Sequence, residues 1–524
     1  MPKPPGFPCH EPHYDEGACQ LAKLNRNNSF WRSDHVGAMQ KSSLEMDGDR
    51  GCALDTDKNT PCLQGSVPVY AVNVSNVEDI KKTVVFAAEK RLRLVVKSSG
   101  HGRSTASGAL SIWTHYFRNI TFHDQFTPEN CKNFEPHSAI TVEAGVQFGD
   151  VYRAAGERGL VVVGGSSQTV GAAGAYVQGG GHSAISPLHG LGSDNVLEYK
   201  VVTADGKLRT ANSCQNKDLF WALRGGGGGT FGVVVSATLK TYKEPNGVIA
   251  AFYGIQTNDT ASTRDLTREL MRLQPSMSDA GWAGYFYIME KMTAIAYLNP
   301  IANMSQANSS FSPLVSFANN HQGLSVLFGN MFAFPNYTSW YFTTKCMNNT
   351  LCTDPVGGNA ASGSRLIPRS NFETDDSLDQ LSDTLIKVLT APLTDKLIIG
   401  HLVAGGAVAR NNNNETSVNP AWRKALLHVI MVSSWEDNAT MEEIGRRNEA
   451  TTRATQLLKD ITPDSGCYIN ESDPNDPEWQ KSYFGANYPR LKAIKNSVDP
   501  QGLFTCWHCV GSEDWTDDLN CSRT

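Results

Sequence analysis

The chain has 524 residues and a formal net charge of -6, from 46 lysines and arginines against 52 aspartates and glutamates. Because this length exceeds what one hydrophobic core usually covers, we expect two domains with enough buried volume for a large bound molecule. The acidic balance and the lack of any run of lysine or arginine argue against nucleic acid as a partner.

The first clear elements are a helix and a strand in residues 75–97. Ser75 and Glu78 are spaced as a capping box, apolar residues follow at helical spacing, and LRLVVK then predicts a buried strand that runs into a glycine-rich loop. Residues 141–163 repeat the pattern, with strand TVEAG, a short helix that stops at Gly159, and strand LVVVG. Together they indicate an α+β protein.

The character of the sequence changes after residue 240. Runs such as IAAFYGIQ, GWAGYFYIM and TAIAYL are typical of strands, and residues 264–273 and 441–459 are predicted as helices. We therefore place a domain boundary near residue 245. Beyond about residue 475 the sequence is compact and aromatic-rich again, which fits a return to the first domain.

Three stretches are dense in glycine. Residues 95–110, VVKSSGHGRSTASGAL, place small residues directly after a buried strand, where backbone N–H groups can approach a diphosphate. Taken alone this pattern is more often a simple turn, but residues 164–206 and 218–240 repeat the density. A Rossmann site would need a helix after the glycines, whereas Gly225 to Gly229 lead into VVVSATLK, a predicted strand. A dinucleotide would have to be held by another fold.

Four motifs in order carry a resemblance to a known family. They are SSGHGRSTASGAL, TVGAAGAYVQGGGHS with GLGSDNVLEYKVVTADG, DLFWALRGGGGGTFG, and YFGANYPRLKAIKNSVDPQGLF. The chain resembles the FAD-linked oxidases of the vanillyl-alcohol-oxidase and berberine-bridge-enzyme family, especially fungal members labelled isoamyl-alcohol-oxidase-like. The resemblance implies a two-part FAD-binding domain of the PCMH type, formed by residues 1–245 and 475–524, with residues 246–474 forming an antiparallel-sheet substrate domain.

The resemblance also implies how FAD is held. His101 would bond to the 8α carbon of the flavin, although a loop histidine hydrogen-bonded to backbone is the alternative reading. Many relatives add a cysteinyl bond, but Ser167 stands at that position and no cysteine lies between Cys131 and Cys214, so we expect a single link. The other expected cofactor contacts are Ser98, Ser99, Gly100, Gly102, Arg103, Ser104, Val170, Gly171, Gly174, Gly181, His182, Val233 and Asn487.

In this family a hydride leaves a substrate carbon for the flavin, a base takes the hydroxyl proton, and oxygen restores the flavin and forms H2O2. Tyr488 is best placed by family position to act on the substrate. His401, in the apolar stretch LIIGHLVAGGAVA, is a second candidate, although a core histidine is at least as common there. Tyr285 and Tyr287 are weaker candidates, because alternating aromatics on a strand are usually core.

Some readings stay open at this point. His182 and His189 fall inside the cofactor motif, but either could be structural. Val170 resembles the valine of members that react with oxygen, which favours a true oxidase. The alternatives are a flavin-binding protein that no longer oxidises, such as a cyclase or redox-silent scaffold, and a carbohydrate oxidase. The substrate could be a primary alcohol, a sugar or a secondary metabolite, and we expect a monomer.

Cysteines and glycosylation sequons indicate a secreted protein. Twelve cysteines favour an oxidising compartment and several disulfides, and Cys52 and Cys62 are a plausible local pair. The motif CWHC at residues 506–509 resembles a redox pair, but in a secreted chain it favours a structural disulfide over a redox centre. The alternative is an intracellular protein with chance sequons. The sequons begin at Asn27, Asn73, Asn119, Asn258, Asn303, Asn308, Asn336, Asn348, Asn414, Asn438, Asn470 and Asn520.

Membrane and metal binding find no support in the sequence. The first residues contain no apolar signal core, so we expect that a secretory signal was removed or lies outside this sequence. No apolar run reaches the length of about 18 residues that a membrane span needs. There is no HExxH motif and no paired CxxC unit, so no metal site is predicted.

Overall fold

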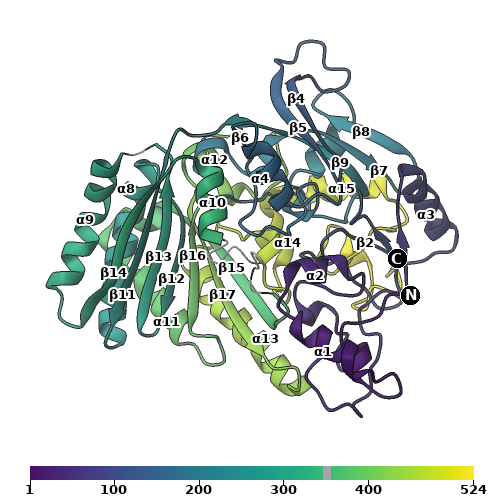
Figure 1. Cartoon of the computed structure of the whole chain (residues 1–524), viewed down its shortest axis with the longest axis horizontal. Helices are drawn as coiled ribbons and strands as arrows, with labels where there is room; N and C mark the ends of the chain where they lie inside the picture. Colours follow the sequence, from purple (N-terminus) through teal and green to yellow (C-terminus); the bar gives the residue numbers. More distant parts are fainter. Residues whose placement is uncertain (302, 346–353, 355, 412–413, 524) are drawn as a thin grey trace.

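The computed structural model describes residues 1–301, 303–345, 354, 356–411 and 414–523. In Figure 1 a large sheet with helices on its outer side occupies the left of the view, and the smaller sheets occupy the right. Both chain ends are marked on the right-hand side, away from the large sheet. The α+β class and the two-part architecture predicted from the sequence are confirmed.

A parallel sheet of three strands begins the first part. Its order is β1 (Tyr70–Asn73), β3 (Leu110–Trp113), β2 (Leu94–Lys97), and helix α3 (Val77–Glu89) packs on it. The predicted capping box is displaced by one residue. Asn76 caps the helix and Asp79 closes the box, because the Asp79 carboxylate accepts from the backbone N–H groups of both Ser75 and Asn76.

A second sheet follows in the order β4 (Ile120–Phe126), β5 (His137–Glu143), β9 (Val233–Lys240), β7 (Val196–Val202), β8 (Leu208–Asn212). The short helix predicted before Gly159 is α4 (Phe148–Gly156), and Gly159 has a φ of 65°. The strand after it, β6 (Leu160–Val161), is shorter than predicted and pairs with β10 (Tyr242–Lys243). VVVSATLK is confirmed as a strand, β9.

The middle of the chain forms an antiparallel sheet of seven strands. Its order is β14 (Leu324–Phe334), β11 (Val248–Thr257), β13 (Met292–Asn299), β12 (Ala283–Met289), β16 (Leu397–Leu402), β17 (Ala425–Trp435), β15 (Asn359–Pro368). Helices α8 (Thr260–Asp279), α9 (Met304–Asn320), α11 (Asp375–Thr390) and α13 (Met441–Asp460) pack against one face. One hydrophobic core fills the space between them and the sheet, and Phe286 and Leu385 are fully buried in it.

The last segment returns to the first part. Helix α14 (Trp479–Phe484) contributes Phe484, and helix α15 (Tyr488–Val498) contributes Leu491, to the core that also holds Phe231. The buried Lys495 ammonium donates to the carbonyl of Thr230 (2.8 Å) and pairs with Asp499. These contacts support the proposed division into residues 1–245, 246–474 and 475–524, although Cys467 already belongs to the first core.

The remaining helices are short. They are α1 (Glu16–Leu24), α2 (Ser29–Asp34), α5 (Ala175–Gln178), α6 (Ser186–His189), α7 (Lys217–Ala222), α10 (Tyr337–Lys345) and α12 (Gly406–Arg410). Among the described residues, no helix combines the length and the apolar character that crossing a membrane would require.

Among the described residues, four disulfides join Cys9 to Cys19, Cys52 to Cys62, Cys131 to Cys214 and Cys506 to Cys509. The predicted pairing of Cys52 with Cys62 is therefore confirmed, and the CWHC cysteines are bonded to each other. Cys467 and Cys521 are free thiols.

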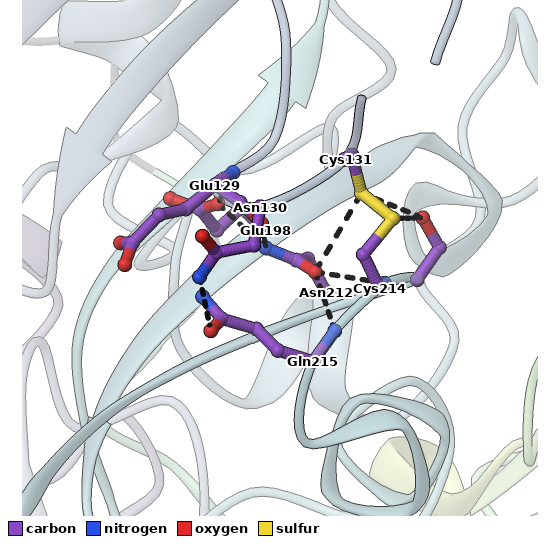
Figure 2. The surroundings of a disulfide bond; sticks show 8 residues. Glu129, Asn130, Cys131, Glu198, Asn212, Cys214 and Gln215 are labelled. Atoms are coloured by element: carbon purple, nitrogen blue, oxygen red, sulfur yellow. Dashed lines mark hydrogen bonds between the residues drawn. A yellow bond between two sulfur atoms is a disulfide. The ribbon is translucent and has the colours of Figure 1, made fainter. Parts of the chain in front are cut away.

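The Cys131–Cys214 bond closes the longest of these loops (Figure 2). Beside it the fully buried Asn212 amide donates to the carbonyl of Glu129 and to the carboxylate of Glu198, both at 2.9 Å. The Asn212 carbonyl accepts from the backbone N–H of Cys214 at 2.8 Å. The bond and this polar network together fasten the connection between β4 and β5 to the end of β8.

This geometry leads to a stability prediction. The Cys131→Ala/Cys214→Ala variant should lose more thermal stability than Cys52→Ala/Cys62→Ala, since the bonded cysteines are 83 residues apart in the first case and 10 in the second. Loop-closure entropy gives about 4 to 5 kcal/mol for the longer loop and about 3 kcal/mol for the shorter one. Calorimetric Tm values check this, and an equal or smaller drop for the 131/214 variant would contradict it.

Candidate flavin and substrate site

The three glycine-rich stretches meet around helix α5. A Cβ on Gly102 would lie 3.4 Å from the Ala175 side chain, and one on Gly228 would lie 2.8 Å from the Ala175 backbone. The carbonyl of Gln178 accepts from the backbone N–H of Gly225 (2.9 Å) and of Gly227 (3.0 Å). Segments far apart in the sequence therefore bring their backbones close together around α5, where N–H groups could approach a diphosphate.

Two of these glycines are required by local geometry. Gly181 has a φ of 77°, and a Cβ there would lie 2.6 Å from the Tyr176 ring. Gly225 has a φ of 143°, and its Cβ would overlap the backbone of Val418. Only glycine adopts these conformations at such close packing without strain. The small size of glycine therefore allows these backbone segments to pack closely. We call the resulting glycine-rich surface around α5 the cradle, and it fits a large flat cofactor such as FAD.

His101 lies in the loop after β2, opposite the stretch SQTVG. Its Nε2 is 2.7 Å from Thr169 Oγ1 and 3.5 Å from Ser167 Oγ. The side chain is partly exposed, but burial by the surrounding protein, together with the charge of Lys41, lowers the pKa of His101 to about 4. The imidazole is therefore neutral at ordinary pH, and Nδ1 is the ring nitrogen that Thr169 leaves free to bond.

The other predicted positions of this loop are placed beside it. Gly171 lies against Ser98, because a Cβ added there would be 3.1 Å from Ser98 Oγ. Gly174 directly precedes α5. Ser98 Oγ donates to the carbonyl of Ala144 at 2.7 Å, the Ser99 carbonyl accepts from Gln40, and Ser104 Oγ donates to the Gly102 carbonyl. Gly100 has a φ of 85°, and Val170 is half-buried against the first core.

Three side chains stand in a row across neighbouring strands of the large sheet. Tyr285 on β12 pairs in register with His401 on β16, which pairs with His428 on β17. Their chain neighbours, among them Phe286 and Leu402, point into the helix-packed core. Since side chains alternate along a strand, the row faces the other way, toward the FAD-binding part.

His182 and Glu471 meet this row from outside the sheet. His182 Nε2 and His428 Nδ1 lie 3.4 Å and 3.5 Å from Glu471 Oε2, and the Nδ1 atoms of His401 and His428 are 3.2 Å apart. His428 is fully buried, His182 and His401 are nearly so, and the Glu471 side chain keeps 33% of its surface exposed. We call His182, His401, His428 and Glu471 the histidine–glutamate cluster.

Burial controls the charge of this cluster. It lowers the pKa of both His401 and His428 well below the ordinary value, and the neighbouring histidines add to the effect. Burial would raise the pKa of the Glu471 carboxyl, but His182, His401 and Lys41 bring that pKa below its ordinary value. The cluster therefore holds an anionic carboxylate beside two neutral imidazoles.

Lys41 lies close enough to His101 and to the cluster to act on both. Its charge helps to lower the pKa of His101 and that of Glu471, and its Nζ donates to Ser362 Oγ at 3.2 Å. The predicted flavin attachment point and the cluster therefore share one charged neighbour.

Aromatic rings surround the cluster. The ring of Tyr285 lies 4.7 Å from that of His401, and the ring of Tyr468 lies 5.1 Å from that of His182. Tyr285 also lines a small pocket with Tyr337 and Trp340. Burial raises the pKa of Tyr285 and Tyr468, so both phenols stay protonated.

Several other predicted residues have their contacts elsewhere. Tyr488 Oη donates to the Glu513 carboxylate at 2.5 Å, and none of its interactions with the described residues reaches the cluster. Asn487 donates to the carbonyl of Val418, and the exposed Arg103 donates to the carbonyl of Trp507. Val233 is buried in the core with Phe504.

Two further residues are also set apart from the cluster. His189 stacks on Tyr242 with ring centroids 3.7 Å apart, which is a structural role. Tyr287 is half-buried on the same face of β12 as Tyr285.

Sequence reasoning missed His428, Glu471 and Tyr468. A signal for His428 was present, because LLHVIM is an apolar strand interrupted by one histidine, the same pattern that singled out His401. Glu471 lies in the irregular stretch INESDP, where a carboxylate has no distinguishing context.

Comparison with known proteins agrees with this geometry. A family model described as FAD binding domain matches residues 68–212, and one described as berberine and berberine like matches residues 467–510. An uncharacterized FAD-linked oxidoreductase of Arthroderma benhamiae is 39% identical over 98% of this chain and 89% of its own length. The FAD-linked oxidoreductase patO of Aspergillus clavatus is 35% identical over 97% of this chain and 86% of its own.

Among solved structures, a VAO-type flavoprotein from Myceliophthora thermophila C1 has a TM-score of 0.90 at 28% identity, covering 98% of this chain and 93% of that one. Fold and site thus define a flavin-dependent oxidoreductase. The chain belongs to the vanillyl-alcohol-oxidase and berberine-bridge-enzyme family of FAD-linked oxidoreductases, as the sequence motifs predicted.

Proposed function

We propose that this protein is an FAD-dependent oxidase that oxidises an alcohol group of a small molecule. The observation that carries the proposal is the row of Tyr285, His401 and His428, which lies beside the anionic Glu471, while the charge of Lys41 acts on both Glu471 and His101. When bound, FAD accepts a hydride from the substrate carbon and passes the electrons to O2, which becomes H2O2. The protein's own groups bind the hydroxyl and take its proton.

Glu471 is the group best suited to receive that proton. Its carboxylate is anionic, partly accessible and held by histidines, whereas the Tyr488 hydroxyl already donates to Glu513. A general base must lie within hydrogen-bond reach of the proton it takes. This supports Glu471 over Tyr488, with His401 and His428 orienting the substrate hydroxyl.

The aromatic rings beside the cluster favour a substrate with an apolar or aromatic body. Tyr285 and Tyr468 lie against the histidines, whereas the pocket that Tyr285 shares with Tyr337 and Trp340 has a volume of only about 10 Å³, enough for no more than a water molecule. Aromatic rings gain most from stacking on or packing against apolar surface. An aromatic or allylic alcohol therefore fits better than an unsubstituted sugar.

We also propose that FAD is bound covalently through His101 alone. Thr169 engages Nε2 of His101, which leaves Nδ1 for the bond to the flavin. Ser167 Oγ lies 3.5 Å from the same imidazole, so a hydroxyl stands where relatives with a second link carry a thiol. The Cys131–Cys214 disulfide occupies the two cysteines that flank this part of the sequence.

Secretion as a glycosylated monomer completes the proposal. Formed disulfides and sequon asparagines that are at least partly exposed support it, while Asn348 lies outside the described residues. Asn470 is the exception among the sequons. Its Nδ2 donates to the carbonyl of Ala175 (3.0 Å) and to Tyr468 Oη (2.7 Å), so a glycan on that nitrogen would replace one of the two hydrogens and break at least one of these bonds.

The first prediction concerns the base. Glu471→Gln should slow flavin reduction by about 10²- to 10⁴-fold, the usual contribution of general acid–base catalysis, with little change in FAD content. Anaerobic mixing with benzyl alcohol, cinnamyl alcohol and glucose, followed by flavin absorbance, measures this rate. Tyr488→Phe is the matched control. A large loss in Tyr488→Phe with none in Glu471→Gln would return the role to Tyr488, and no bleaching by any alcohol would overturn the oxidase proposal.

The second prediction concerns the flavin link. Acid denaturation should leave flavin attached to a proteolytic peptide that contains His101, and His101→Ala should give apoprotein or dissociable FAD. Peptide mass spectrometry reads both results. Free FAD in the supernatant of wild-type protein, or a second adduct on a cysteine, would refute the single histidyl link.

The third prediction concerns oxygen. Val170→Ile should slow reoxidation of the reduced flavin, because one more methylene in a close-packed site fills the small void that a diatomic molecule needs. Anaerobically reduced protein mixed with aerated buffer gives the rate. Slow reoxidation of the wild type would contradict the oxidase assignment, and equal rates in both proteins would remove Val170 from oxygen control.

A further inference from the structure

The histidine–glutamate cluster brings together four possible metal ligands from four separate segments. One ligand atom from each of the four side chains lies within 4.8 Å of every other. His182 and Glu471 are 289 residues apart, which explains why no metal-binding motif is visible in the sequence.

Three of the six separations between ligand atoms match those of a tetrahedral ion, and the other three are no longer than 4.8 Å. Bonds of about 2.0–2.1 Å at tetrahedral angles place neighbouring ligand atoms roughly 3.3–3.4 Å apart. The contacts of the cluster are 3.2 Å between His401 Nδ1 and His428 Nδ1, 3.4 Å between His182 Nε2 and Glu471 Oε2, and 3.5 Å between His428 Nδ1 and Glu471 Oε2.

Hydrogen bonds within the protein do not satisfy this cluster. His428 Nδ1 can give its single hydrogen to His401 or to Glu471, but not fully to both. In the described part of the chain no group pairs with His428 Nε2 or His182 Nδ1, although both atoms are buried. These two atoms are on the outer side of the rings. A cation at the centre would engage the inner nitrogens, His182 Nε2 and the Nδ1 atoms of His401 and His428, and would remove their competition for one hydrogen.

The cluster is also rigidly held. His401 and His428 are fixed by the paired register of β16 and β17, and the carbonyl of His182 accepts from Tyr176 Oη at 2.8 Å. The rings of Tyr468 and Trp422 lie within 6.3 Å of the His182 ring. A preformed site in an apolar surround retains a bound ion better than a flexible one.

We infer that His182, His401, His428 and Glu471 bind one divalent transition-metal ion, with Zn²⁺ as the best match. Imidazole suits zinc, copper, iron and nickel, and a site of histidines with one glutamate is typical of zinc. The four side chains already complete a tetrahedral set. The ion would hold Glu471 through one carboxylate oxygen, and the other oxygen, on the exposed side of this residue, would stay free to take the substrate proton, a role that rests on the proposed function.

The test is metal binding in the whole protein, measured before any substrate is added. Protein stripped with EDTA and desalted is titrated with Zn²⁺, and bound zinc is compared with flavin by mass spectrometry of the elements. We expect about one zinc per chain. Co²⁺ should give d–d absorption at wavelengths beyond the flavin bands, with the intensity of a tetrahedral site.

Two variants remove ligands and one serves as the control. His428→Ala and Glu471→Gln should each weaken zinc binding by more than about tenfold. His189→Ala removes the histidine at the end of α6, whose ring stacks on Tyr242. This variant should bind zinc as the wild type does. Flavin content and circular dichroism identify any variant that fails to fold. Since Glu471 is partly exposed, its variant keeps the test decisive if His428→Ala does not fold.

Wild-type protein that binds far less than one zinc, or variants that bind it as wild type does, would overturn the inference. These outcomes are separate from those of the proposed function. A protein that binds zinc but is reduced by no alcohol would keep the metal site and lose the oxidase. A protein that alcohols reduce normally but that binds no zinc would keep the oxidase and lose the metal site.

Discussion

The pairing register of β12, β16 and β17 determines what the large sheet presents to the FAD-binding part. A slip by one residue would turn every side chain of a strand to the opposite face. On β16 such a slip would bury His401 among the helices and turn Leu402 toward the FAD-binding part. Burying one such leucine is worth about 1.5–3 kcal/mol, and an imidazole placed in that core would have no partner. The apolar face therefore holds the polar row in place.

The site is assembled from three parts of the chain that pack as separate layers. The sheet supplies His401 and His428, the glycine-rich motif supplies His182, and the returning segment supplies Glu471. None of these parts contains the whole cluster. An ionised carboxylate in such a buried place needs compensating partners, and it finds them only when all three parts are docked.

Much of the fold could be predicted because it follows from local rules. The glycine stretches predicted a cofactor site. The strand predicted after Gly229, where a Rossmann site would have a helix, indicated that this site belongs to another fold. His401 was singled out because a histidine interrupts an apolar strand. Tyr488 was favoured by family position, but side-chain direction on α15 is a matter of packing, and its hydroxyl turns to Glu513. Nothing in the sequence near Glu471 shows that the loop ends beside three histidines.

The helix cap at α3 illustrates the same limit on a small scale. Ser75 and Glu78 have the correct spacing, yet Asn76 and Asp79 have it too, one residue later. Spacing alone could not choose between them. The structure uses the later pair, since Asn76 Oδ1 accepts from the Asp79 N–H and Asp79 accepts from the N–H groups of Ser75 and Asn76. Either start would bury the same Ile80 and Val84.

The late position of Glu471 has a consequence for how the protein is made. The strands and glycine motifs emerge from the ribosome long before this carboxylate and the helices that follow it. Because α15 also completes the core of the first part, a nascent chain has neither a finished flavin cradle nor a finished cluster. A cradle that α15 completes therefore forms only when synthesis is nearly finished, so flavin binding to the completed cradle comes late in the life of the chain.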